Sequence, residues 1–206
     1  MKKIKKFNIA SKLLLIGTIF VIFPIVFNVL ELSIVLTAGL WFPQGLMTVI
    51  DYVPYVGYGL IFAALLLMYH LTNGTQYAFI TFVFYILATI FFHTYTYFIP
   101  SNYLLAVNNC KDPVMSLLEI LYMYLLMSGM IEYLRIIGEG KNLRRERKNL
   151  KIFTAALAIG FLFSILATIF SSTILDTIFS LCSSISRCVA YVVFFIFIAV
   201  ASRRED

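Results

Sequence analysis

Charged residues are scarce in this chain. Asp, Glu, Lys and Arg make up 13% of the 206 residues, whereas roughly a quarter is usual for a soluble globular domain. Hydrophobic residues make up 62%. This composition excludes a soluble domain as the main body of the protein and indicates a membrane protein.

Residues that build catalytic or metal centres are also few. The chain has two histidines and three cysteines (Cys110, Cys182 and Cys188), and it contains no C-x-x-C pair. It also lacks the H-E-x-x-H and G-x-S-x-G motifs. We therefore expect no disulfide framework, no metal site and no cofactor, and we predict that the protein is not an enzyme.

Six apolar segments are each long enough to cross a bilayer, which takes about 20 helical residues. Backbone groups within lipid must be hydrogen-bonded inside the protein, so each segment should be a helix. The sequence therefore predicts an all-α bundle of six transmembrane helices that forms a single domain over residues 1–206. The predicted spans are 13–36, 52–71, 76–98, 114–137, 152–174 and 177–200.

The last apolar run is too long to be one span. As a single helix, residues 152–200 would extend over roughly 73 Å, more than twice the thickness of the hydrocarbon layer. We expect the chain to turn at Ser171, Ser172, Thr173 and Asp176.

Basic residues are concentrated on one side of the predicted bundle. Five precede the first span, seven flank the segment between the fourth and fifth spans, and two follow the sixth. An even number of spans puts all of them on the same face, and such a bias marks the cytoplasmic side. We expect an inner-membrane protein with both termini in the cytoplasm.

Arg187 is the costliest residue to place in lipid, because it lies near the middle of the sixth span. An arginine there costs about 2.5–3.5 kcal/mol and needs an acidic partner, for which Glu119 or Glu31 is suitably placed. Asp51 lies near the outer end of span two, and His93 lies in the outer third of span three. We predict that these five residues form a ligand- or ion-binding site or a buried polar network.

The outer half of span six is rich in serine, whereas residues 189–200 are nearly all apolar. Spans one, two, three, four and six each contribute a polar or ionisable group to the outer half of the bundle, and span five is expected to contribute none. This polar layer either fixes how the helices pack or forms a cavity that opens outward. Both interpretations remain open at the level of sequence.

Two other patterns concern helix contacts. Tyr52, Tyr55 and Tyr58 share a face of span two and either line the same cavity or, as we favour, form an interfacial aromatic belt. Pro54 is expected in the first turn of that span, where proline is tolerated. Span five carries small residues spaced by four, which predicts close contact with a helix of the same chain or of a neighbour. These residues are Ala156, Gly160, Ser164, Thr168 and Ser172.

The segment between spans four and five is strongly basic. Its plain role is to fix the orientation of the chain in the membrane. Alternatively, it binds anionic lipid or a partner protein through Lys141, Arg144, Arg145, Arg147, Lys148 and Lys151. The absence of interleaved aromatic residues disfavours nucleic acid as a partner. The expected partners are membrane lipids, a cytoplasmic protein and a second copy of the chain.

Together these patterns favour a non-enzymatic inner-membrane sensor or anchor subunit that oligomerises or couples to a cytoplasmic partner, in a signalling, immunity or defence type of role. The alternative is a transport subunit for a small solute or an ion, with its polar site in the outer half of the bundle.

Overall fold

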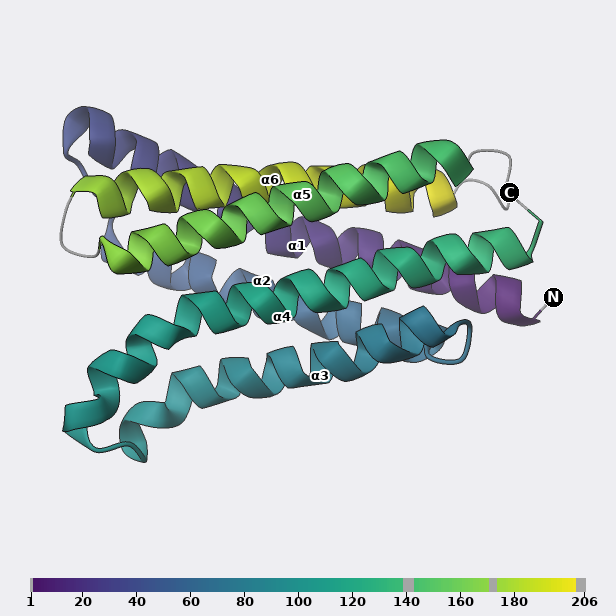
Figure 1. Cartoon of the computed structure of the whole chain (residues 1–206), viewed down its shortest axis with the longest axis horizontal. Helices are drawn as coiled ribbons and strands as arrows, with labels where there is room; N and C mark the ends of the chain where they lie inside the picture. The colour runs from purple at the N-terminus through teal and green to yellow at the C-terminus, as the bar shows by residue number, and fades with distance from the viewer. Residues whose placement is uncertain (1, 139–142, 171–173, 203–206) are drawn as a thin grey trace.

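A computed structural model of the chain describes residues 2–138, 143–170 and 174–202. In these residues it contains six long α-helices, one short 3-10 helix and no strand (Figure 1). All six long helices are apolar enough to cross a membrane, so the predicted multi-pass, all-α architecture is confirmed. They are α1 (Lys2–Ala38), α2 (Gln44–Met68), α3 (Asn73–Thr94), α4 (Ser101–Ile136), α5 (Leu143–Ile169) and α6 (Ile174–Ser202), with η1 (Tyr95–Tyr97) after α3.

Successive helices run in opposite directions along the bundle (Figure 1). The start of α1 and the end of α6 lie at the same end, which we call the terminal end. The α2–α3 turn lies there too, as do the end of α4 and the start of α5 (Figure 1). The opposite end, called the loop end below, holds the α1–α2 and α3–α4 connections.

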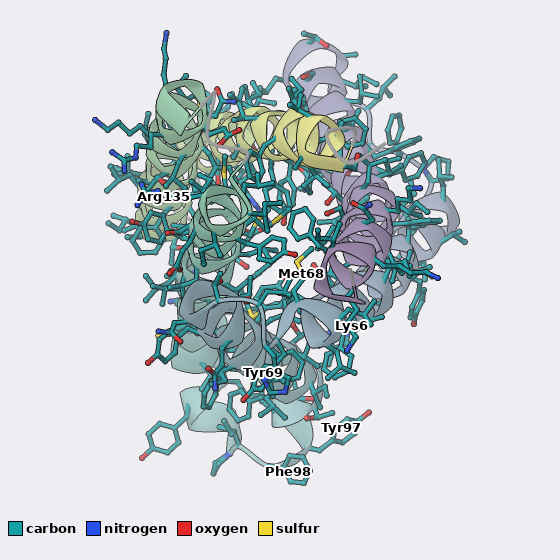
Figure 2. The ribbon with its side chains drawn as sticks, turned by 90° about the vertical axis from the view of Figure 1, so that its right-hand side faces the viewer. Lys6, Met68, Tyr69, Tyr97, Phe98 and Arg135 are labelled. Carbon is teal, nitrogen blue, oxygen red and sulfur yellow. The ribbon has the colours of Figure 1, made fainter. Side chains whose placement is uncertain are left out.

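The six helices form a closed ring in which each helix contacts the next and α6 contacts α1. The contacts are most extensive between α5 and α6, α1 and α2, and α3 and α4, and they are least extensive between α2 and α3. Figure 2 views the ring from the terminal end and shows side chains filling its centre. The outside of the ring carries many exposed large apolar side chains.

Two glycine contacts let helix backbones approach closely. A Cβ added to Gly57 of α2 would lie 2.7 Å from the carbonyl oxygen of Gly17 of α1. A Cβ added to Gly129 of α4 would lie 2.5 Å from the backbone nitrogen of Thr75. The Thr72 side chain caps α3 and also donates a 3.2 Å hydrogen bond to the Gly129 carbonyl. Any side chain at these glycines would push the backbones apart, so the glycines set the helix spacing.

The small-residue pattern of span five packs within the chain at Gly160. The Ser183 hydroxyl of α6 donates a 2.9 Å hydrogen bond to the Gly160 carbonyl. A Cβ on Gly160 would lie 3.4 Å from Cγ of Arg187. This contact holds α6 against α5 at the level of Arg187. Ser172 lies outside the described residues.

Several helices are longer than the predicted spans. α1 begins at Lys2 rather than near residue 13, and α4 begins at Ser101 rather than near residue 114. The apolar pattern marks only the part of a helix that lies in hydrocarbon, whereas backbone hydrogen bonding continues into the polar flanks. Cys110 and Lys111, which the predicted spans leave in a loop, therefore lie on α4.

Two local predictions need correction or remain open. Pro54 lies inside α2, well beyond the first turn where it was expected, because the helix starts at Gln44. Asp176 belongs to the first turn of α6 rather than to a turn between helices. The other residues of the expected turn, Ser171, Ser172 and Thr173, lie outside the described residues.

Candidate functional site

An ion pair links α4 and α6 in the interior of the ring. Nη2 of Arg187 lies 2.8 Å from Oε2 and 3.0 Å from Oε1 of Glu119. The Tyr191 hydroxyl donates a second hydrogen bond to Oε1 of Glu119. The Glu119 side chain is only 3% exposed, whereas the Arg187 side chain is 33% exposed. The Glu119 carboxylate is thus enclosed by its hydrogen-bond donors, whereas part of the Arg187 side chain remains accessible.

The helix periodicity of α6 explains this arrangement. Arg187 and Tyr191 are four residues apart, so their side chains lie on the same helix face, one turn apart. Both therefore reach the same carboxylate on α4. A buried carboxylate without such donors would be strongly destabilising, since an isolated ionised group loses its hydration without compensation.

A polar cavity of about 440 Å³ lies next to the ion pair, on its loop-end side. Its mouth is formed by exposed side chains near the start of α4, among them Asn108, Asn109 and Asp112. The cavity therefore opens at the loop end. Its lining also includes Asn28 of α1, Tyr85 of α3, Lys111, Ser116 and Glu119 of α4, Ser164 and Thr168 of α5, and Asp176, Ser180, Ser183, Ser184 and Arg187 of α6.

On the terminal-end side of the ion pair the interior is closed. The next turns of α4 and α6 contribute Tyr122, Leu126 and Phe194, each at most 1% exposed. Tyr122 packs edge-on against Phe82 of α3, with 4.9 Å between ring centroids. The described interior on this side of the ion pair is thus packed, and Glu119 lies at the floor of the cavity.

Two other predicted site residues belong to a second, separate cavity. Asp51 of α2 and His93 of α3 line a space of about 420 Å³ together with Thr48, Tyr52, Tyr55 and Lys111. The Tyr55 hydroxyl and Nε2 of His93 share a 3.1 Å hydrogen bond. Lys111 is the residue that lines both cavities.

The single polar layer predicted from the sequence is therefore divided. The structure brings Arg187 and Glu119 together in one cavity and places Asp51 and His93 in the other. Glu31 is buried, with 9% of its surface exposed, but it lines neither cavity. The position of a residue along its helix does not determine which side of the ring its side chain faces. Residues from the same half of the bundle can therefore line different cavities.

Two of the three tyrosines on this face of α2 are hydrogen-bonded to α3. The hydroxyls of Tyr58 and Tyr85 are 2.8 Å apart and hydrogen-bonded, and Tyr85 lines the first cavity. Tyr55 bonds to His93, as described above, whereas Tyr52 is 65% exposed. Tyr52 and Tyr55, which is 40% exposed, both lie at the surface, and both also line the second cavity.

Sequence reasoning missed several cavity residues. Ser164 and Thr168 line the cavity from α5, although span five was expected to contribute nothing. Tyr191 lies in the part of span six that was taken as apolar, yet it bonds to Glu119. The spacing of four from Arg187 is the signal that could have identified Tyr191.

The predicted basic surface is only partly described. Arg147, Lys148 and Lys151 are exposed near the start of α5, at the terminal end. Lys141 and the side chains of Arg144 and Arg145 lie outside the described residues. A partner or lipid role for this set remains a prediction.

No protein-family model, no curated protein and no solved structure matches this chain. Within the described part of the chain, no group of three His, Cys, Asp or Glu side chains is placed to hold a metal ion. The site is therefore interpreted from its own geometry.

The ion pair generates a stability prediction. Arg187→Met should destabilise the protein by about 3–5 kcal/mol, because it leaves the enclosed Glu119 carboxylate without its cation. Glu119→Gln keeps an acceptor for Tyr191 and should cost less. Arg187→Met combined with Glu119→Gln should recover much of the loss, as measured by thermal unfolding in detergent.

Lys111→Met is the matched control, since it removes a cavity cation that forms no ion pair with another described side chain. It should change the unfolding temperature little. If Arg187→Met and the double variant unfold at the same temperature, the Glu119 carboxylate does not need a positive partner, and the prediction is contradicted.

Proposed function

We propose that this protein is a non-enzymatic subunit of the cytoplasmic membrane that binds a small polar solute from the outer side and senses it. The observation that carries this proposal is the polar cavity that opens at the loop end and is closed beneath the Arg187–Glu119 pair. A purely structural ion pair would not require an open, hydrophilic space of this size beside it.

The size and lining of the cavity indicate the class of solute. Its volume of about 440 Å³ falls in the range of about 300–1,000 Å³ found for small-molecule sites. Its described lining includes two basic residues, Lys111 and Arg187, and three acidic residues, Asp112, Glu119 and Asp176. A lining with both signs of charge favours a zwitterionic or uncharged polar solute over an ion of high charge, because each charged group of a zwitterion finds an opposite partner.

The closed interior favours sensing over transport. A transported solute would have to pass the level of Tyr122, Leu126 and Phe194, where the described side chains are tightly packed. A sensor requires only that the bound solute change the helix packing. Since Glu119 is on α4 and Arg187 is on α6, a solute that engages either residue also acts on the contact between these helices.

In this proposal the terminal end faces the cytoplasm, where basic residues are favoured. The exposed Arg147, Lys148 and Lys151 would then lie on the face available to a cytoplasmic partner or to a second copy of the chain. Such a partner would carry the output of the sensor.

Solute binding can be measured as stabilisation of the purified protein. In a panel of amino acids, polyols and small carboxylic acids, a true ligand at a hundred times its dissociation constant should raise the unfolding temperature by about 5–10 °C. Arg187→Gln and Glu119→Gln should abolish this shift. Ser184→Ala should weaken it, because Ser184 lines the cavity.

Ser186→Ala is the matched control for Ser184→Ala, because Ser186 lies on the same helix but outside the cavity lining. It should leave the shift unchanged. A shift that persists in both Arg187→Gln and Glu119→Gln would place solute binding elsewhere and contradict the proposal.

The orientation can be tested with a native cysteine. Cys110 is exposed on α4 near the loop end, so a membrane-impermeant maleimide should label it in intact cells. Cys110→Ser should lose the label. Ser202→Cys in the Cys110→Ser background lies at the terminal end and should react only after lysis. Labelling of Cys110 only after lysis would reverse the proposed orientation.

A further inference from the structure

A groove between α4 and α5 lies at the terminal end, far along both helices from the solute cavity. Its volume is about 290 Å³. Ser128, Glu132 and Arg135 line it from one face of α4, since they are spaced by four and three residues. Arg147 and Leu150 line it from the first turns of α5. Two guanidinium groups from different helices thus border one opening.

Neither guanidinium group is neutralised by a described carboxylate. Between described side chains, the one cation–carboxylate contact within 4.0 Å is that of Arg187 and Glu119. Arg135 and Arg147 are both exposed, and Glu132 lines the same groove without forming an ion pair with either. The groove therefore presents two unpaired cations and one carboxylate.

The groove is also bordered by apolar surface. Ile131, which is 6% exposed, lines it together with Leu150. Ile136 follows Arg135 on α4, and Ile152 is two residues after Leu150 on α5; they are 66% and 43% exposed. Exposed isoleucines on the outside of a membrane bundle contact acyl chains. A ligand bound here would have its charged part on the arginines and an apolar part against Ile131 and Leu150, which line the groove.

We propose that this groove binds the headgroup of an anionic phospholipid. Arg135 and Arg147 hold the phosphate, because planar guanidinium groups form paired hydrogen bonds with phosphate oxygens. Glu132 accepts hydrogen bonds from headgroup hydroxyls. This role explains why a carboxylate lines the groove next to two arginines that bind phosphate. The chemistry therefore favours a glycerol headgroup, as in phosphatidylglycerol. Basic pockets between transmembrane helices are typical sites for such headgroups.

Native mass spectrometry of the full chain in detergent, titrated with defined lipids, tests this assignment. Phosphatidylglycerol should bind more tightly than phosphatidylcholine. Arg135→Gln and Arg147→Gln should each weaken phosphatidylglycerol binding about tenfold, since each removes a charge-assisted hydrogen bond. Glu132→Gln should reduce the preference for phosphatidylglycerol over phosphatidic acid, which has no headgroup hydroxyls.

Lys148→Gln is the matched control, because it removes the neighbouring exposed cation on α5 without touching the groove lining. It should leave the affinity unchanged, and size-exclusion chromatography checks that every variant is folded. An equal loss in Lys148→Gln would mean that only the general basic surface attracts lipid, and would overturn the site. Competition by inorganic phosphate at the concentration of the lipid would assign the groove to free phosphate instead, and equal binding of phosphatidylcholine would also contradict the proposal.

Discussion

The enclosed carboxylate of Glu119 is the constraint on which the rest of this structure depends. A carboxylate in the interior of a membrane bundle must be met by donors, and two side chains of α6 supply them, Arg187 and Tyr191. This fixes the rotation of α6, which in turn places Ser183 against the Gly160 carbonyl of α5. One electrostatic requirement thus sets the register of three helices, and it leaves the remaining surface of Arg187 facing a polar space.

The ring architecture places that space between a packed interior and the loop end. Close backbone contacts at Gly17 with Gly57 and at Gly129 with Thr75 draw neighbouring helices together. On the terminal-end side of the ion pair, aromatic and aliphatic side chains such as Tyr122 and Phe194 fill the centre. On the loop-end side, serine, threonine and asparagine side chains line a hydrophilic cavity. The two halves of the bundle therefore differ in chemistry, and the ion pair marks the boundary between them.

The sequence was sufficient to predict the class of fold, because hydrocarbon imposes helices of a minimum length and apolar runs reveal them directly. It also made Glu119 one of two candidate partners for Arg187, since a central arginine leaves few alternatives at the right depth. It could not show which side of the ring each residue faces. Asp51 and His93 were expected in the same outer half of the bundle as Arg187 but line another cavity, and Glu31 lines neither.

The apolar pattern did not show where the helices end, and one polar contact made from an apolar segment was missed. Pro54 was misplaced because α2 continues past the apolar segment to Gln44. Tyr191 was overlooked because a tyrosine in an apolar run is compatible with a packing role, although its spacing of four from Arg187 places it on the helix face that meets Glu119.

The most direct test of this account is a distance between Arg187 and Glu119 in a lipid bilayer. Solid-state NMR with ¹⁵N-labelled arginine and ¹³C-labelled glutamate should detect a guanidinium–carboxylate coupling that matches the 2.8 Å contact between Nη2 and Oε2. That coupling should vanish in Glu119→Gln. A spectrum that is the same in the wild type and in Glu119→Gln would show that the two side chains are not paired, and would contradict the central claim.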